Sequence, residues 1–333
     1  MNTLKKIVFG LLFFSLLIKP SFSHEVPWEG WYNQAGQLIN QGKYEEGVRA
    51  AKKALKIAEK TKADKDFKVN LSLKVLIHYY MLQAKYKEAE PLVKRALKIA
   101  QDDPNMLNNL AMIYTEEGKF DQAEETAQQS VSIAEKKFGA SDVRTAESLS
   151  ALAGVYQTEG KYKEAGPLYE QALELWKKEL SENHPTVVLA MGNLGSVYGA
   201  MGRYDEANSL LTRVLSIHQS TLPPNHPIVA VSLREIGKLR IREGNFVSAE
   251  AFLKKALKIQ EKTLGKKHPE VGSTIGRLGL VYRLQKNFKE AASCYRCARK
   301  IFAKTYGSKN PYTQDIDKEL QTLKEDKKEA KSN

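Results

Sequence analysis

Hydrophobic residues recur along most of the chain at the spacing of an α-helix. Leu149, Leu152 and Tyr156 lie three and four residues apart, and the same spacing returns 42 residues later, from Met191 to Tyr198. Residues at this spacing fall on one side of a helix and form a single buried stripe. The pattern therefore predicts helices that are apolar on one side and polar on the other.

A three-residue signature interrupts the hydrophobic stripes at regular intervals. Its seven copies are Gly42-Lys43-Tyr44, Ala84-Lys85-Tyr86, Gly118-Lys119-Phe120, Gly160-Lys161-Tyr162, Gly202-Arg203-Tyr204, Gly244-Asn245-Phe246 and Lys286-Asn287-Phe288. Successive copies lie 42, 34, 42, 42, 42 and 42 residues apart. Glycine tolerates the positive φ at which helices commonly end. The chain is therefore predicted to consist of seven units, each made of two helices joined at this turn.

Small residues recur at fixed places in both predicted helices. Before the turn they are Ala111, Ala153, Gly195, Gly237 and Gly279, and after it they are Ala89, Ala123, Ala165, Ala207, Ala249 and Ala291. Small side chains let two helix backbones approach closely, which indicates tight packing within each unit. One isolated pair of such helices is marginal in water, whereas seven stacked pairs share a continuous core. A tyrosine also recurs at one position of the first helix, and Arg240 replaces it in the sixth unit.

The pattern resembles the tetratricopeptide repeat, in the 42-residue form typical of kinesin light chains. The joints between units carry the specific marks of this form, such as Leu222–Pro227 (LPPNHP) and Leu264–Pro269 (LGKKHP). The resemblance covers about residues 28 to 308. It implies an all-α, right-handed α–α superhelix of about seven helix pairs. The eight residues beyond an ordinary 34-residue unit are expected to lengthen the second helix of each pair.

The repeat divides the chain into segments, with atypical ends that close the core. Trp28 and Trp31 add bulk at the front, and Tyr312, Ile316, Leu320 and Leu323 share one helical stripe at the back. The predicted segments are a signal peptide (1–23), an N-terminal cap with the first repeat (24–60), repeats two to seven (61–103, 104–141, 142–183, 184–225, 226–267 and 268–309), a capping helix (310–324) and a charged, disordered tail (325–333).

The first 23 residues have the layout of a secretory signal peptide. Lys5 and Lys6 precede the apolar run Ile7–Ile18, and small residues at Ser21 and Ser23 place a cleavage site before His24. A helix of 12 residues is only about 18 Å long, which is short of the roughly 30 Å hydrocarbon core of a membrane. We therefore expect cleavage and export, with a periplasmic location favoured and secretion as the alternative. No later segment is apolar and long enough to span a membrane.

The chain is basic, which raises nucleic acid as a partner. Its formal net charge is +13, and loss of Lys5, Lys6 and Lys19 with the signal peptide leaves +10. The lysines, however, are spread in pairs over the array and the aromatic residues follow packing columns, so no specific nucleic-acid site is predicted. A solvated basic surface explains the charge.

The surface expected to bind a partner is the concave side of the array, which the first helices line. Its polar residues turn basic toward the C-terminus. The residues predicted to contact a partner are Asn108, Asn109, Asn193, Arg234, Lys238, Arg242, Arg277 and Arg283. The resemblance implies asparagines that bond to a peptide backbone, and arginines suit carboxylates. A solvated cluster partly balanced by Glu235 and Glu243 is the alternative interpretation.

No catalytic, metal or cofactor site is predicted. The six histidines form no metal-ligand pair, and His184, His226 and His268 precede prolines, where helix capping explains them. Cys294 and Cys297 lie three residues apart within a predicted helix. Cys294 is interpreted as a small buried packing residue and Cys297 takes the place of Gln171, with a redox or metal role left open.

These features favour a non-enzymatic scaffold or adaptor that binds a protein or peptide in the concave groove. The charge of the groove suits an acidic partner. Two alternatives stay open at this stage. One is a secreted effector or regulator that acts on proteins outside the cell, and the other is a non-catalytic subunit of an enzyme complex. The sequence does not define the oligomeric state.

Overall fold

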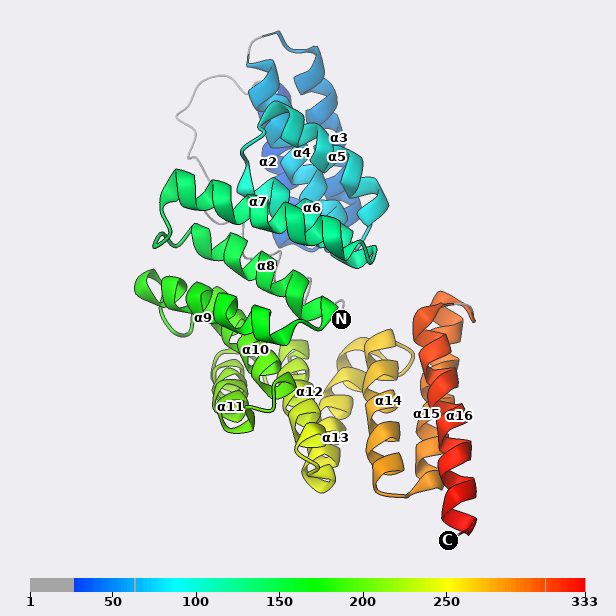
Figure 1. The fold of residues 1–333 in the computed structure, drawn as a ribbon. Helices are drawn as coiled ribbons and strands as arrows, with labels where there is room; N and C mark the ends of the chain where they lie inside the picture. Colours follow the sequence, from blue (N-terminus) through cyan, green and yellow to red (C-terminus); the bar gives the residue numbers. More distant parts are fainter. Residues whose placement is uncertain (1–26, 63, 309, 333) are drawn as a thin grey trace. The chain divides into compact units, whose positions relative to one another are not determined.

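The structure is a computed structural model that describes residues 27–62, 64–308 and 310–332, and within these residues it is all-helical. The prediction of an all-α fold built from helix pairs is confirmed. The seven pairs are α2 (Pro27–Asn40) with α3 (Tyr44–Lys60), α4 (Lys65–Leu82) with α5 (Tyr86–Ile99), α6 (Pro104–Glu116) with α7 (Phe120–Phe138), α8 (Thr145–Glu159) with α9 (Tyr162–Glu179), α10 (Pro185–Ala200) with α11 (Tyr204–Thr221), α12 (Pro227–Arg242) with α13 (Phe246–Leu264), and α14 (Pro269–Leu284) with α15 (Phe288–Tyr306). A last helix, α16 (Pro311–Ser332), follows them (Figure 1).

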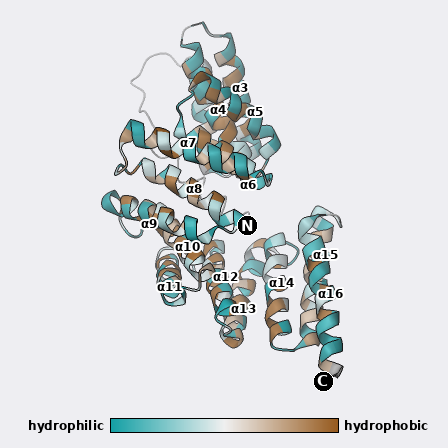
Figure 2. Ribbon diagram, viewed as in Figure 1, coloured by the Kyte–Doolittle hydropathy of each residue, from teal (hydrophilic) through white to brown (hydrophobic). Residues whose placement is uncertain are grey.

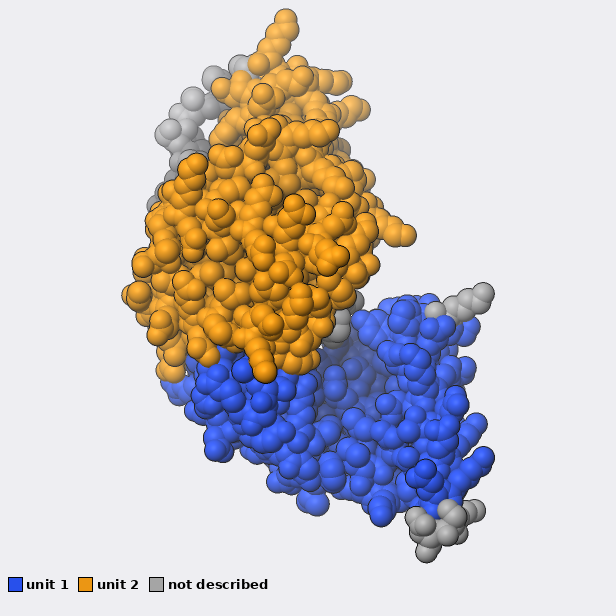
Figure 3. All heavy atoms as spheres, viewed as in Figure 1, with its two compact units in different colours: residues 1, 191–333 blue, residues 2–190 orange. Residues whose placement is uncertain are grey.

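The helices group into two compact units (Figure 3). We call residues 2–190 the N-terminal unit and residues 191–333 the C-terminal unit, so the boundary lies within α10. Each unit is described by itself below. Hydrophobic and hydrophilic residues alternate along individual helices in both units, as their amphipathic sequence predicts (Figure 2).

Each pair turns at the repeated signature, where the backbone takes a positive φ. The five glycines at this place have φ between +68° and +90°, as expected for residues without a Cβ. Ala84 and Lys286 adopt the same region, with φ of +55° and +62°. The repeat therefore imposes the turn even where a side chain makes it unfavourable.

The joints before α6, α10, α12 and α14 begin the next helix with a proline and a capping side chain. Asp103 accepts from the backbone N–H groups of Asn105 (3.1 Å) and Met106 (3.3 Å). The Nδ1 of His226 accepts a hydrogen bond from the backbone N–H of Ile228 at 3.2 Å, and the Nδ1 of His268 accepts one from that of Glu270 at 3.1 Å. The expected capping role of these histidines is confirmed.

Glycines on α12 and α14 let a side chain of the second helix pack directly against the first. A Cβ added to Gly237 would lie 2.9 Å from Leu253, and one added to Gly279 would lie 2.8 Å from Tyr295. Such contacts are too short for a side chain, so the glycines are required by packing. The extra residues of the long repeats lie partly in the second helix, because α9 and α15 have 18 and 19 residues against 14 in α5.

The large hydrophobic residues predicted to cap the two ends of the array pack against neighbouring helices. In the N-terminal unit the Trp28 indole donates to Ser72 (2.9 Å), and Lys53 lies 3.9 Å from the Trp31 ring centroid. In the C-terminal unit Ile316 and Leu323 of α16 are buried in a cluster with Tyr295 and Phe302.

The structure differs from the prediction of a disordered tail after residue 324. The last helix does not end at residue 324 but continues to Ser332. Part of the reason is a contact that composition does not reveal, since Asp326 pairs with Arg283 of α14 at 3.2 Å. The predicted signal peptide lies outside the described residues, and none of the helices described is long and apolar enough to cross a membrane.

Candidate interaction surface

The first helices of the last pairs meet on one side of the C-terminal unit. The Ser196 hydroxyl of α10 donates to Glu235 of α12 at 3.2 Å, and the Arg234 guanidinium of α12 pairs with Glu270 of α14. These bridges join three consecutive first helices. We call the group made of Arg234, Glu235, Lys238, Arg242, Glu270 and Arg277 the basic cluster, because it has four cations and two carboxylates.

Glu235 is the internal counter-charge of the basic cluster. Its carboxylate lies 2.5 Å from the Lys238 amine and 4.0 Å from the Arg234 Nε. Burial by itself would raise the pKa of Glu235, but the charges of Lys238 and Arg234 outweigh it and lower the pKa to about 2. Glu235 is therefore ionised at neutral pH and neutralises part of the cluster.

Arg234 is held inside the unit and is not open to a partner. Its side chain is 5% exposed and that of Glu270 is 7% exposed, so the ion pair between them is buried. A buried pair of this kind fixes the position of two helices, here α12 and α14. Arg234 was predicted to contact a partner, but in the structure it bridges α12 and α14 from a buried position.

Arg277 and Arg242 are the cations of the cluster that have no carboxylate partner among the described residues. The Arg277 Nε is buried and makes no hydrogen bond with them. Burial lowers the pKa of Arg277, Glu235 raises it, and the neighbouring charges of Arg234 and Arg242 lower it further. Arg242 is exposed and extends toward α10, where a Cβ on Gly199 would lie 3.9 Å from its Nη1.

Arg283 has a different position from the other predicted basic residues. It pairs with Asp326 (3.2 Å) and lies 3.6 Å from Glu319, both on the last helix. Its contacts therefore hold α16 against α14, and it does not belong to the basic cluster.

The predicted asparagines are divided between the two units. Asn108 and Asn109 are half-buried on α6 of the N-terminal unit, and the Asn108 Oδ1 is buried without a hydrogen-bond partner among the described residues. Asn193 is half-buried on α10 of the C-terminal unit, one repeat before Glu235. Each unit thus has its own set of predicted contact residues.

Sequence reasoning missed two acidic residues that shape these surfaces. Glu270 lies in the first turn of α14, directly after the proline. Acidic residues are common at this place, so the sequence gives no sign that Glu270 is a buried partner of Arg234. Glu147 of α8 is half-buried, and burial raises its pKa to about 7. No periodic signal distinguishes either residue from a solvated acid.

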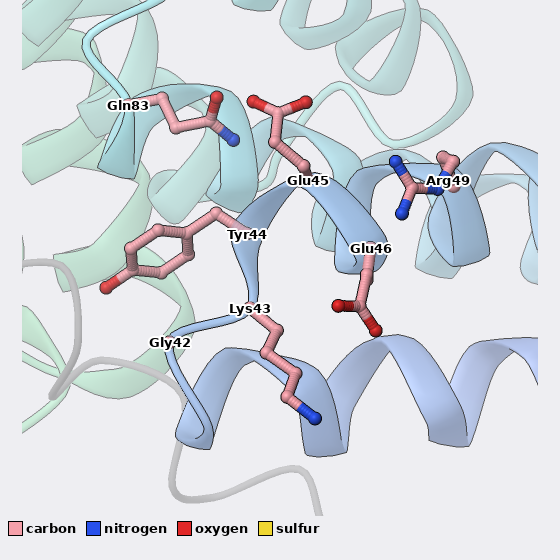
Figure 4. Close-up of a pocket in the computed structure, with 7 residues that line it drawn as sticks. All are labelled: Gly42, Lys43, Tyr44, Glu45, Glu46, Arg49 and Gln83. Carbon is pink, nitrogen blue, oxygen red and sulfur yellow. The ribbon is translucent and has the colours of Figure 1, made fainter.

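A separate hollow lies at the turn of the first helix pair (Figure 4). It is lined by Gly42, Lys43, Tyr44, Glu45, Glu46, Arg49 and Gln83. Both signs of charge occur in it, and Glu45 is paired with Lys85 at 3.2 Å. The hollow lies at the turns and not along the first helices, and its mixed charges favour no particular ligand.

The two cysteines of α15 are free thiols. Burial raises the pKa of Cys294 to about 11, so this thiol is protonated and weakly nucleophilic at neutral pH. Among the described residues, no group of three or more His, Cys, Asp or Glu side chains is placed to hold a metal ion.

Comparison with known proteins identifies the class of this fold. A tetratricopeptide repeat model matches residues 102–165, 144–220, 189–262 and 228–304, which together span more than half of the chain. The chain belongs to the tetratricopeptide repeat family. A search of curated proteins gives no match.

Several solved structures are similar to this chain. Nearly identical TPR-like repeats assigned to a kinesin light chain of Podosopora anserina are 29% identical, with a TM-score of 0.51, and the match covers 61% of this chain and 98% of that one. A tetratricopeptide repeat protein from Parabacteroides merdae covers more of this chain, 89%, and 98% of its own, at 18% identity and a TM-score of 0.59. A Rap protein in complex with competence and sporulation factor has a TM-score of 0.62 at 14% identity, over 89% of this chain and 87% of that one.

Proposed function

We propose that this protein is an exported scaffold or adaptor that works in the periplasm. It binds an acidic segment of a protein or peptide on the side of the C-terminal unit lined by α10, α12 and α14. It acts by binding and not by catalysis. The repeat fold supports the general part of this proposal, because tetratricopeptide repeats are suited to protein–protein interaction.

The buried, unpaired Nε of Arg277 carries the proposal for the acidic partner. A buried donor without an acceptor costs about 1–3 kcal/mol, and a carboxylate at this place would remove that cost. The cluster also has two more cations than anions, so it favours a ligand with negative charge. Arg277 and Arg242 are the residues assigned to this ligand.

A crosslinking experiment in the native compartment tests the proposal. A photo-crosslinking amino acid at Asn193 should capture a protein with an acidic segment, whereas the same group at the exposed Lys258 of α13 should not. The capture should disappear in the double variant Arg277→Gln/Arg242→Gln. Arg296→Gln/Lys300→Gln is the matched control. It removes the same charge from exposed positions on α15, which is the second helix of its pair.

Two results would contradict the binding site. One is equal crosslinking from both positions, and the other is capture that survives the arginine substitutions. Export is tested separately by cell fractionation and by mass spectrometry of the N-terminus. We expect periplasmic protein that begins at His24, and recovery from the culture medium would favour a secreted effector instead.

A further inference from the structure

Three aromatic rings meet in the C-terminal unit where α15 ends and α16 begins. The ring centroids of Tyr306 and Tyr312 lie 5.7 Å apart, and Phe302 lies 6.3 Å from Tyr306 and 5.9 Å from Tyr312. Phe302 is 6% exposed, whereas Tyr306 and Tyr312 are 39% and 44% exposed. The buried ring therefore supports two tyrosines that stay in solvent.

Exposed lysines lie on the same segments as these tyrosines and on the joint beside them. Lys304 precedes Tyr306 by two residues on α15, and Lys266 and Lys267 lie in the joint that precedes α14. None of these three lysines forms an ion pair with a described residue. We call the two tyrosines and three lysines the aromatic edge.

Both joints of the aromatic edge lie at the same end of the helices. A Cβ on Gly272, in the first turn of α14, would lie 3.2 Å from Phe302 near the end of α15. The start of α14, the end of α15 and the start of α16 thus come together (Figure 1). Two acids at this end are already paired, since Glu270 is buried against Arg234 and Asp315 lies 3.4 Å from Lys318.

The long joints before α8, α10, α12 and α14 do not expose aromatic residues in this way, whereas the joint before α4 in the N-terminal unit exposes a single ring, that of Phe67 (59%). The residues one, two and three repeats before Tyr306 are Leu264, Leu222 and Leu180, all half-buried. Four repeats before it, the Phe138 ring is covered by the Arg144 guanidinium at 4.1 Å, which is itself held by Asp142 at 2.8 Å. The exposed tyrosine pair is therefore a feature of the last joint and not of the repeat.

We propose that the aromatic edge binds the surface of an anionic phospholipid membrane. Tyrosine rings are amphipathic and concentrate at the boundary between lipid and water, where the hydroxyl stays hydrated. Lysines near such a surface are attracted by lipid phosphates, and each raises the affinity about fivefold. Two exposed rings beside three exposed lysines provide both contributions at one end of the C-terminal unit. This membrane contact is independent of the partner site on the basic cluster.

Vesicle flotation measures this interaction directly. The protein is purified in the form that cells accumulate and is mixed with vesicles of equal parts phosphatidylglycerol and phosphatidylcholine, or of phosphatidylcholine alone. Binding is expected on the anionic vesicles only. Lys266→Gln/Lys267→Gln should lower the partition coefficient at least about tenfold. Tyr306→Ser/Tyr312→Ser should lower it several-fold at unchanged charge.

The matched control removes two adjacent lysines from another place. Lys177→Gln/Lys178→Gln takes the same charge from exposed positions on α9 of the N-terminal unit and should bind like the wild type. Circular dichroism checks the fold of the tyrosine variant, and the lysine variants test the proposal without disturbing any packed ring. Equal losses in the two lysine variants, unchanged binding by a folded tyrosine variant, or binding of polyglutamate but not of vesicles would each overturn the proposal.

Discussion

The guanidinium of Arg240 donates a hydrogen bond to the side-chain oxygen of Asn208, which lies 32 residues earlier on the second helix of the preceding pair. The same separation joins the Tyr156 hydroxyl to Glu124, at 3.0 Å, and the Tyr282 hydroxyl to Glu250, at 3.1 Å. Arg240 therefore replaces the tyrosine of its column and keeps the contact between consecutive pairs. The charged side chain is tolerated there because its guanidinium also pairs with the Glu243 carboxylate at 2.5 Å.

This relationship predicts coupling between Arg240 and Asn208. The single variants Arg240→Ala and Asn208→Ala should each destabilise the protein, because each removes the hydrogen bond between the two helices. The double variant should lose about 1 kcal/mol less than the sum of the two singles, since the hydrogen bond between the two side chains can be lost only once. Urea unfolding of the four proteins gives this coupling energy. A value near zero would show that the two columns are independent.

Two turns should become more stable when their strained residue is replaced by glycine. Ala84 and Lys286 have φ of +55° and +62°, a region that costs a residue with a side chain about 1–2 kcal/mol. Glycine removes this strain but makes the unfolded chain more flexible, so Ala84→Gly and Lys286→Gly should each gain about 0.5–1 kcal/mol. The reverse change Gly160→Ala, at φ +90°, serves as the control and should destabilise. Thermal unfolding decides the sign in each case.

The turns also show how much of the fold the sequence determines. Seven copies of one signature predicted seven helix pairs, because a repeated turn residue and a repeated hydrophobic stripe leave little freedom to the backbone. Ala84 and Lys286 fit the pattern only through their position in the repeat, and the structure places them in the same conformation as the glycines. The repeat overrides the local preference.

The interaction surface could be predicted only in part. Periodicity placed Arg234 and Arg277 on the side of the first helices, but it did not show that Arg234 pairs with Glu270, 36 residues away, and leaves the Arg277 Nε unpaired among the described residues. The direction of a long side chain depends on which neighbours are buried, and this information does not lie in the spacing of one helix. The length of α16 escaped prediction for the same reason, since Asp326 is held by Arg283 of another helix.

The buried pair between Arg234 and Glu270 predicts a large effect from a small change. Arg234→Gln removes the cation from a carboxylate whose side chain is 7% exposed, so the protein should lose about 3 kcal/mol of stability. The double variant Arg234→Met/Glu270→Leu removes both charges and should lie closer to the wild type. Lys318→Gln, which breaks an exposed pair with Asp315, should change stability by less than about 0.5 kcal/mol. Equal effects of Arg234→Gln and Lys318→Gln would contradict the buried pair.

Glu147 should make the stability of the N-terminal unit depend on pH near neutrality. Burial raises its pKa from an ordinary 4.5 to about 7, so the folded chain holds a proton that the unfolded chain has released between these values. The stabilising contribution of the protonated carboxyl is therefore complete below the unfolded pKa and is lost as the pH rises through 7. Glutamine resembles the protonated form and cannot ionise. Glu147→Gln should accordingly unfold like the wild type at pH 4.5 or below and be more stable by about 3 kcal/mol at pH 8.5. Glu164→Gln, at an exposed position in the first turn of α9, provides the comparison and should show no such crossover. A difference between Glu147→Gln and the wild type that stays constant across this range would mean that the Glu147 carboxyl does not change its protonation there.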